Sequence, residues 1–164
     1  MTAALELRST GPEDREWVSD RILEWWAAPF VVMRGQLFTP ADLPGFLATV
    51  NDERVGLVTY RIDGDWCEIV TLNSLREGMG IGTALLEAVK RAALDAGCKR
   101  LSLITTNDNL HALGFYQRHG WQITAIFPGA VDRTRQTLKP NISPIGENGI
   151  PLRDEIELDM PLGG

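Results

Sequence analysis

The chain has 164 residues, of which 44% are apolar and 23% charged, and its 16 Lys and Arg against 22 Asp and Glu give a net charge of −6. A chain of this length can bury roughly 70% of its unfolded surface, so a core forms without disulfide or metal staples. The longest stretch without a charged residue has 13 residues (119–131), fewer than the ~18 apolar residues of a membrane span. We expect one soluble domain over residues 1–164.

The charge balance and the spacing of cysteines and histidines disfavour several classes of partner. The acidic balance argues against a surface that binds nucleic acid, because such surfaces carry a basic stripe. Cys67 and Cys98 lack a Cys-x-x-Cys spacing, and His111 and His119 are eight residues apart, so we expect no metal site and a structural role for both histidines. No export signal precedes Glu6, which favours the cytoplasm.

The first half of the chain reads as one strand and one helix followed by strands. Pro12 opens a helical pattern in which Val18, Ile22, Trp25 and Trp26 form one apolar stripe, and Pro29 closes it. Asp63-Gly64 is a hairpin turn signal. The expected strands are residues 5–8, 30–34, 46–50, 54–62 and 66–72.

The second half alternates helices and strands. A helix follows Gly82, with Gly97 as the residue just after its end, and a shorter one is stopped by Gly120. Residues 128–149 contain several breaks and a small basic cluster, so we expect a long surface loop. The expected segments are a helix to residue 96, a strand at 99–106, a helix at 110–119, and strands at 121–127 and 153–160.

A glycine cluster lies between a predicted strand and a predicted helix. In Gly78-Met79-Gly80-Ile81-Gly82-Thr83 the backbone N–H groups and the helix dipole can bind a phosphate. The dinucleotide pattern Gly-x-Gly-x-x-Gly fails because Thr83 stands three residues after Gly80, and no Gly-Lys-Ser/Thr follows for a P-loop. A protein that binds ATP or NAD is therefore disfavoured, and a merely flexible turn remains the alternative.

A second motif lies one strand downstream, at Asn109-x-x-Ala112-x-x-Phe115-Tyr116 followed by Gly120-Trp121. On a helix, Asn109 and Tyr116 share a stripe about 10 Å apart along the axis and can line one cleft. The two motifs in this order, over residues 66–121, resemble the GNAT superfamily of acyl-CoA-dependent N-acetyltransferases. The resemblance implies a mixed α/β (α+β) fold with a mostly antiparallel central sheet flanked by helices on both faces.

The resemblance implies acetyl-CoA as cosubstrate, held at its diphosphate by the backbone amides of residues 78–83. The family has Gln or Arg where this chain has Glu77, and Arg76 is displaced by one position. Arg76 could still supply positive charge, and Glu77 could cap the helix or face solvent. Asn109 would bond the pantetheine, with helix N-capping as an equally weighted alternative.

Acyl transfer to an amine needs a hydrogen-bond donor that polarises the thioester carbonyl, a base that deprotonates the amine, and an acid that protonates the departing sulfur. The resemblance implies that the backbone N–H near Leu72 polarises the thioester and that Tyr116 protonates the departing sulfur; a buried core aromatic is the alternative for Tyr116. Strand alternation puts Glu68 on the face of Val70 and Leu72, where it could act as base. An ion pair with a neighbouring Lys or Arg explains Glu68 equally well.

The acceptor is expected to be an amine on a small molecule or peptide. Trp25 and Phe30 could line its pocket, and Arg133 and Arg135 could meet an acidic group, although a solvated basic loop is favoured. Exposed final strands in such folds can pair in a homodimer. The rival function is a non-catalytic acyl-CoA-binding or regulatory module, since a fold alone does not fix function.

Overall fold

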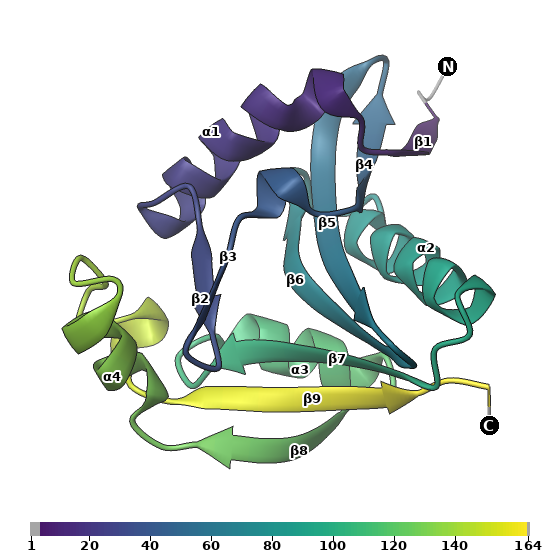
Figure 1. Cartoon of the computed structure of the whole chain (residues 1–164). Coiled ribbons are helices and arrows are strands. Elements are labelled where there is room, and N and C mark those ends of the chain that lie inside the picture. The colour runs from purple at the N-terminus through teal and green to yellow at the C-terminus, as the bar shows by residue number, and fades with distance from the viewer. Residues whose placement is uncertain (1–3, 164) are drawn as a thin grey trace.

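The computed structural model describes residues 4–163. Within them, seven strands form one sheet in the order β1-β4-β5-β6-β7-β9-β8, and a separate hairpin pairs β2 with β3 (Figure 1). The strands are β1 (Leu5–Ser9), β2 (Val31–Met33), β3 (Gln36–Phe38), β4 (Gly45–Val50), β5 (Glu53–Asp63), β6 (Trp66–Ser74), β7 (Arg100–Thr106), β8 (Gln122–Phe127) and β9 (Glu155–Pro161).

Helices cover both faces of the sheet. The helices of the described chain are α1 (Arg15–Trp26), α2 (Ile81–Asp95), α3 (Leu110–Arg118) and α4 (Ala130–Thr137). α2 and α3 pack with the larger apolar core on one face, while α1 and the β2–β3 hairpin pack with a second core on the other. Among the described strand pairs, β6 and β7 alone run parallel. The expected mixed, mostly antiparallel sheet with helices on both faces is confirmed.

The end of α2 follows its sequence signals. Its buried side chains include Leu85, Val89 and Ala93, which lie four residues apart on one stripe facing the sheet. Gly97 adopts a φ of +83°, its N–H donates to Leu94, and the next N–H donates to Ala93. This is the Schellman closure expected of a glycine after a helix.

The start of α1 is fixed to the sheet by a buried carboxylate. Asp14 is 0% exposed and accepts two hydrogen bonds of 2.7 Å from Arg8 of β1, two from Arg54 of β5, and one from the N–H of Gly11. The bonds from Arg8 hold the pKa of Asp14 well below its usual range, against the opposing effect of burial. The other end of α1 is thereby directed toward the hairpin (Figure 1).

Replacing Asp14 with Asn is expected to lower the free energy of unfolding at pH 7 by about 3 kcal/mol, because Arg8 and Arg54 lose their shared anion. The pKa of Asp14 is depressed in the fold, so its contribution is present above the unfolded pKa and is lost as the pH falls below it. Urea unfolding at pH 7 and pH 3 measures this. If the free energies of unfolding of wild type and variant differed by the same amount at both pH values, the depressed pKa of Asp14 would be contradicted.

The sheet opens between its two parallel strands. β6 pairs with β7 only from Trp66 opposite Arg100 to Ile69 opposite Leu103. Beyond that point the two strands diverge, as Figure 1 shows. The register of β6 on β5 shifts at the same place, because Thr59 faces Thr71 whereas Tyr60 faces Ile69. This leaves Val70 as the extra residue of a β-bulge, which bends β6 away from β7.

Three expectations about the chain's course were wrong. Residues 128–149 are not all loop, because α4 occupies Ala130–Thr137, and the short strand β3 was missed. The last strand, β9, is not an exposed edge: it lies between β7 and β8. The described free edges of the main sheet are β1 and β8, so of the two final strands β8 is the exposed one, and a homodimer through it stays a prediction.

Candidate functional site

Two cavities meet where β6 and β7 separate. The inner cavity lies between the end of α1, the hairpin, β6, β7 and the segment after α4, and the glycine-loop cavity lies beside the start of α2. Each has a volume of about 710 Å³. A ligand extending through both would pass the residues that line them together: Leu72, Asn73, Asn109, Ala112, Tyr116 and Glu147.

The glycine loop presents free backbone donors to its cavity. Gly78 and Gly80 adopt φ values of +77° and +68°, a conformation that glycine reaches without steric cost. The first intrahelical bond of α2 runs from Ala84 to Gly80. None of the N–H groups of residues 78–83 has an acceptor among residues 4–163. These donors, together with the helix dipole, are of the kind that can bind a phosphate or diphosphate.

α3 is fixed against the first turn of α2. A Cβ on Gly82 would come within 3.2 Å of the Phe115 ring, so glycine permits this approach. His119 lies with Nδ1 2.8 Å from the Phe115 carbonyl and Nε2 3.0 Å from the Thr83 hydroxyl. A carbonyl can only accept, so Nδ1 carries a proton and Thr83 can donate to Nε2. His119 therefore has the structural role expected of it.

Arg76 and Glu77 both line the glycine-loop cavity. The Arg76 guanidinium forms an ion pair with Glu53 of β5, and both side chains are well exposed. An exposed pair of this kind is worth little, so Arg76 can exchange Glu53 for a bound anion. Glu77 also lines the cavity where the family has Gln or Arg. The positive charge at this end therefore comes from a displaced Arg76 and from the helix dipole.

The backbone of Leu72 faces the gap between the strands. Leu75 donates its N–H to Val55 of β5 at 2.8 Å. Because N–H groups alternate between the two sides of a strand, the N–H of Leu72, three residues earlier, points away from β5 and toward β7. β7 has already diverged there. The donor expected near Leu72 is thus placed at the junction of the two cavities.

Tyr116 lies at that junction from the opposite side. It is 8% exposed, contacts the Trp121 ring with centroids 5.6 Å apart, and belongs to the larger core. It also lines both cavities. Burial raises the pKa of Tyr116 above its ordinary value, so its phenol remains protonated at neutral pH. Tyr116 is therefore a packed aromatic that also lines both cavities with a protonated phenol.

Asn109 caps α3, and binding of the pantetheine by it stays a prediction. Its side-chain oxygen accepts the N–H of Ala112 at 3.1 Å, which caps the start of α3. The same residue lines both cavities. The cap fixes the amide oxygen toward the helix, so the NH₂ group is the part that can bond a ligand.

Glu68 shares a face with Val70, as strand alternation predicted, but not with Leu72. The bulge at Val70 reverses the alternation, so Leu72 packs in the α2 core while Val70 packs in the α1 core. Glu68 is 1% exposed and does not line the inner cavity. Its two carboxylate oxygens accept from Arg34 at 3.0 Å and from Arg61 at 2.9 Å. This geometry favours the ion-pair interpretation of Glu68 over that of a base.

A different carboxylate, Glu155, lines the inner cavity and was missed from the sequence. It begins β9 opposite Thr106, is 4% exposed, and accepts the backbone N–H of Arg34 at 3.1 Å. Burial raises the pKa of Glu155, and the bond from Arg34 only partly opposes this. The available signal was an acidic residue at the start of a strand, which identifies nothing without the strand's neighbours.

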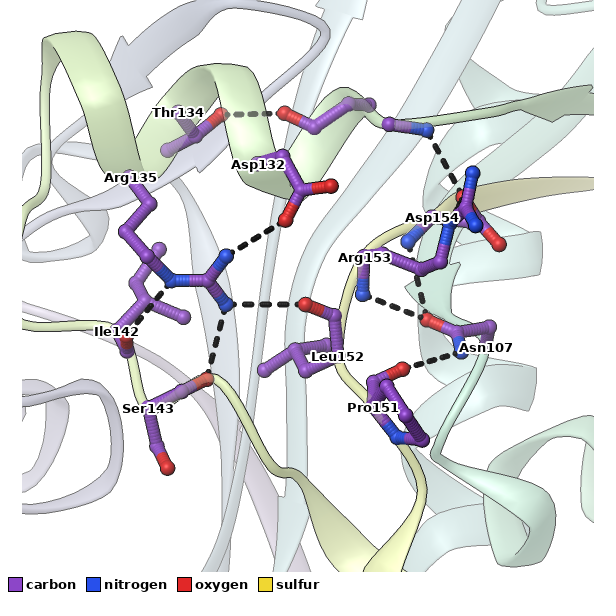
Figure 2. Close-up of polar contacts among 12 residues, drawn as sticks. Asn107, Asp132, Thr134, Arg135, Ile142, Ser143, Pro151, Leu152, Arg153 and Asp154 are labelled. Carbon is purple, nitrogen blue, oxygen red and sulfur yellow. Dashed lines mark hydrogen bonds and ion pairs between the residues drawn. The ribbon is translucent and has the colours of Figure 1, made fainter.

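The aromatic and basic residues that the sequence suggested for the acceptor pocket are only partly present in the inner cavity. Trp25 and Trp26 line it, as expected for Trp25, whereas Phe30 is absent from the described lining. Arg135 is not available to an acceptor, because it bonds Asp132 and three backbone carbonyls, and Arg133 donates to the Pro128 carbonyl. Figure 2 shows Arg135 joining α4 to residues 142, 143 and 152. The wall is thus held as a defined structure.

Comparison with known proteins gives the family to which this fold, with its cleft at the strand divergence, belongs. The Acetyltransferase (GNAT) family model matches residues 3–121. The uncharacterized protein YdhI of Bacillus subtilis (strain 168) is 46% identical over 144 residues, which cover 87% of this chain and 89% of that protein. The chain belongs to the GNAT acetyltransferase family.

Solved structures with similar folds include an IAA acetyltransferase from Bacillus cereus ATCC 14579, with a TM-score of 0.71 and 22% identity over 97% of this chain and all of the other. A GNAT family acetyltransferase from Elizabethkingia anophelis, solved with acetyl-CoA bound, gives a TM-score of 0.68 and 24% identity, covering 96% and 98% of the two chains. At sequence identities this low, the comparison shows that the folds are alike. No helix among residues 4–163 is long and apolar enough to cross a membrane.

Proposed function

We propose that this protein transfers the acetyl group of acetyl-CoA to the amine of a small acceptor. The observation that carries the proposal is the meeting of two cavities at Leu72 and Tyr116, one with free backbone donors and the other with a buried carboxylate. A substrate bound in each cavity would bring its reacting group to this junction. Family membership supports acetyl transfer, and the inner cavity is of a size suited to a small molecule.

The residues of the glycine-loop cavity fit the cosubstrate. The donors of residues 78–83 would hold the diphosphate, and Arg76 would add positive charge. Asn109 and Asn73 line the path from there to the junction, where amide groups suit the polar pantetheine arm. Acetyl-CoA supplies the thioester, whose carbonyl carbon is the electrophile. The chain itself supplies binding and proton transfer.

Two groups at the junction assist the reaction. The Leu72 N–H donates a hydrogen bond to the thioester carbonyl oxygen, where negative charge develops as the amine attacks. The Tyr116 hydroxyl donates its proton to the departing sulfur. Both donors are fixed by packing before substrate binds, Leu72 within β6 and Tyr116 within α3, where its ring packs on Trp121. Such preorganisation lowers the reorganisation needed during reaction.

Glu155 is the better placed of the two candidate bases. Its carboxylate lines the inner cavity, and its raised pKa makes it a stronger proton acceptor than an exposed glutamate. Glu68 remains the second candidate, although both of its oxygens are occupied by arginines. The base removes a proton from the acceptor ammonium, directly or through water, and leaves the neutral amine that attacks the thioester.

Ligand-dependent melting followed by an acceptor screen tests the proposal. CoA and acetyl-CoA at 100 times their Kd are expected to stabilise the fold by about 2.7 kcal/mol, whereas ATP and NAD should not. Thiol release from acetyl-CoA is then measured with a panel of amines. Stabilisation without any accepted amine would favour the acyl-CoA-binding module. Stabilisation by ATP or NAD alone would contradict the assignment of the glycine loop.

A further inference from the structure

Lys139 is a buried lysine in the wall of the inner cavity. It is 7% exposed, although lysine is almost never fully buried unless it is paired. Its Nζ donates to the Phe30 carbonyl at 3.2 Å and lies 5.4 Å from the centre of the Phe30 ring. No carboxylate of residues 4–163 forms an ion pair with it. Its charge is therefore incompletely compensated.

Lys139 also differs in charge from the rest of the wall. Among the described residues that line the inner cavity it is the single basic one, and the other charged residues there are Glu24, Asp108, Glu147 and Glu155. The carboxylates attract an ammonium group, whereas Lys139 attracts an anion. A ligand carrying both charges would satisfy both parts of this wall, because buried charges are stable when they are paired.

The segment that carries Lys139 is held in place before any ligand binds. Lys139 follows α4, and its own N–H bonds the Thr134 carbonyl at 2.9 Å. Arg135 fixes the next residues by donating to the carbonyls of Ile142 and Ser143 and, across the loop, of Leu152 (Figure 2). A cation held by such a scaffold loses little conformational entropy when it binds an anion.

We propose that Lys139 binds an acidic group on the acceptor, so that the substrates of this enzyme are amino acids or similar small molecules with both an amine and a carboxylate. The inference rests on the proposed acetyl transfer. In that complex the ammonium faces Glu155 and the carboxylate meets the Lys139 ammonium. Trp25 and Trp26, in the same wall, then contact the apolar remainder of the acceptor.

Matched acids and amides test the inference. Acetylation rates are measured for a panel of α-amino and ω-amino acids, each compared with its carboxamide. The proteins compared are wild type, Lys139→Met and Lys139→Arg, with Lys99→Met as a control at an exposed lysine. We expect wild type and Lys99→Met to favour the best acid over its amide at least tenfold in kcat/KM. The ratio should fall to about one in Lys139→Met and stay above about three in Lys139→Arg, because Arg keeps the charge.

A Lys139→Met variant that lost only the contact with Phe30, and no contact with the acceptor, would give a different result. A purely structural lysine would lower thermal stability and the rates for acid and amide in parallel, leaving their ratio unchanged and overturning the inference. A wild-type enzyme that acetylates acids and amides equally would overturn it too, while leaving acetyl transfer intact.

If no amine is acetylated, the proposed function is rejected, and a binding measurement then tests the anion site at Lys139 separately. The CoA-saturated protein is then melted with the same acids and amides. Stabilisation of wild type by acids alone, lost in Lys139→Met, supports an anion site at Lys139. Absence of such stabilisation overturns it.

Discussion

Replacing Glu155 with Gln is expected to lower kcat at pH 7.5 at least 100-fold, because the acceptor ammonium loses the group that takes its proton. Burial raises the pKa of Glu155, so in wild type the carboxylate form is lost, and kcat falls, as the pH drops through that raised value. Gln cannot titrate, so this acid limb should vanish from the variant's profile. The measurement is kcat against pH with saturating acetyl-CoA and acceptor.

The Glu155→Gln substitution should lower activity without lowering stability. A carboxyl whose pKa is raised in the fold opposes folding once it ionises, so the Glu155 carboxylate destabilises the protein at pH values above its unfolded pKa. Gln keeps the oxygen that accepts the Arg34 N–H. We therefore expect Glu155→Gln to be at least as stable as wild type at pH 7.5, as is common where a site is built at the expense of stability.

Glu68→Gln is the matched control, because it makes the same chemical change in the other candidate base. It leaves Arg34 and Arg61 without their shared buried anion, so the free energy of unfolding should fall by about 3 kcal/mol. The acid limb of kcat should remain. If the limb instead vanishes in Glu68→Gln and persists in Glu155→Gln, the base is Glu68 and our assignment of Glu155 is wrong.

The parts of the site that the sequence predicted are local in the chain. The glycine loop and α2 were predicted because a strand, positive-φ glycines and a helical apolar stripe follow one another within residues 66–97. The mixed, mostly antiparallel sheet with helices on both faces followed from the family resemblance. Asn109 and Tyr116 were related by helix geometry alone, and both line the two cavities.

The parts that were missed depend on distant segments. The bulge at Val70 is a property of the pairing between β5 and β6, and it puts Leu72 on the opposite face from Glu68 and Val70. Glu155 and Lys139 line the inner cavity because β9 inserts between β7 and β8 and because α4 carries Lys139 toward Phe30. α4 itself buries only Ala130, Val131 and Thr134, too short a stripe for periodicity to identify.

Replacing Tyr116 with Phe is expected to slow turnover at least tenfold while changing the Kd for acetyl-CoA less than about threefold. The substitution removes the proton donor to the sulfur and keeps the ring that packs on Trp121. The Tyr116 hydroxyl has no hydrogen-bond partner among residues 4–163, so stability should not fall. Single-turnover acetylation and CoA titration measure the two quantities separately.

The other tyrosine of the chain provides the control. Tyr60 is also buried, at 9% exposure, and burial likewise raises its pKa, but it stacks on Phe46 in β4 and lines neither cavity. Tyr60→Phe therefore removes a comparable buried hydroxyl outside both cavities and should leave kcat within about twofold of wild type. A general fall in rate in both variants would indicate a packing effect. An unchanged kcat in Tyr116→Phe would exclude its phenol as the acid, and the departing thiolate would then take its proton from water.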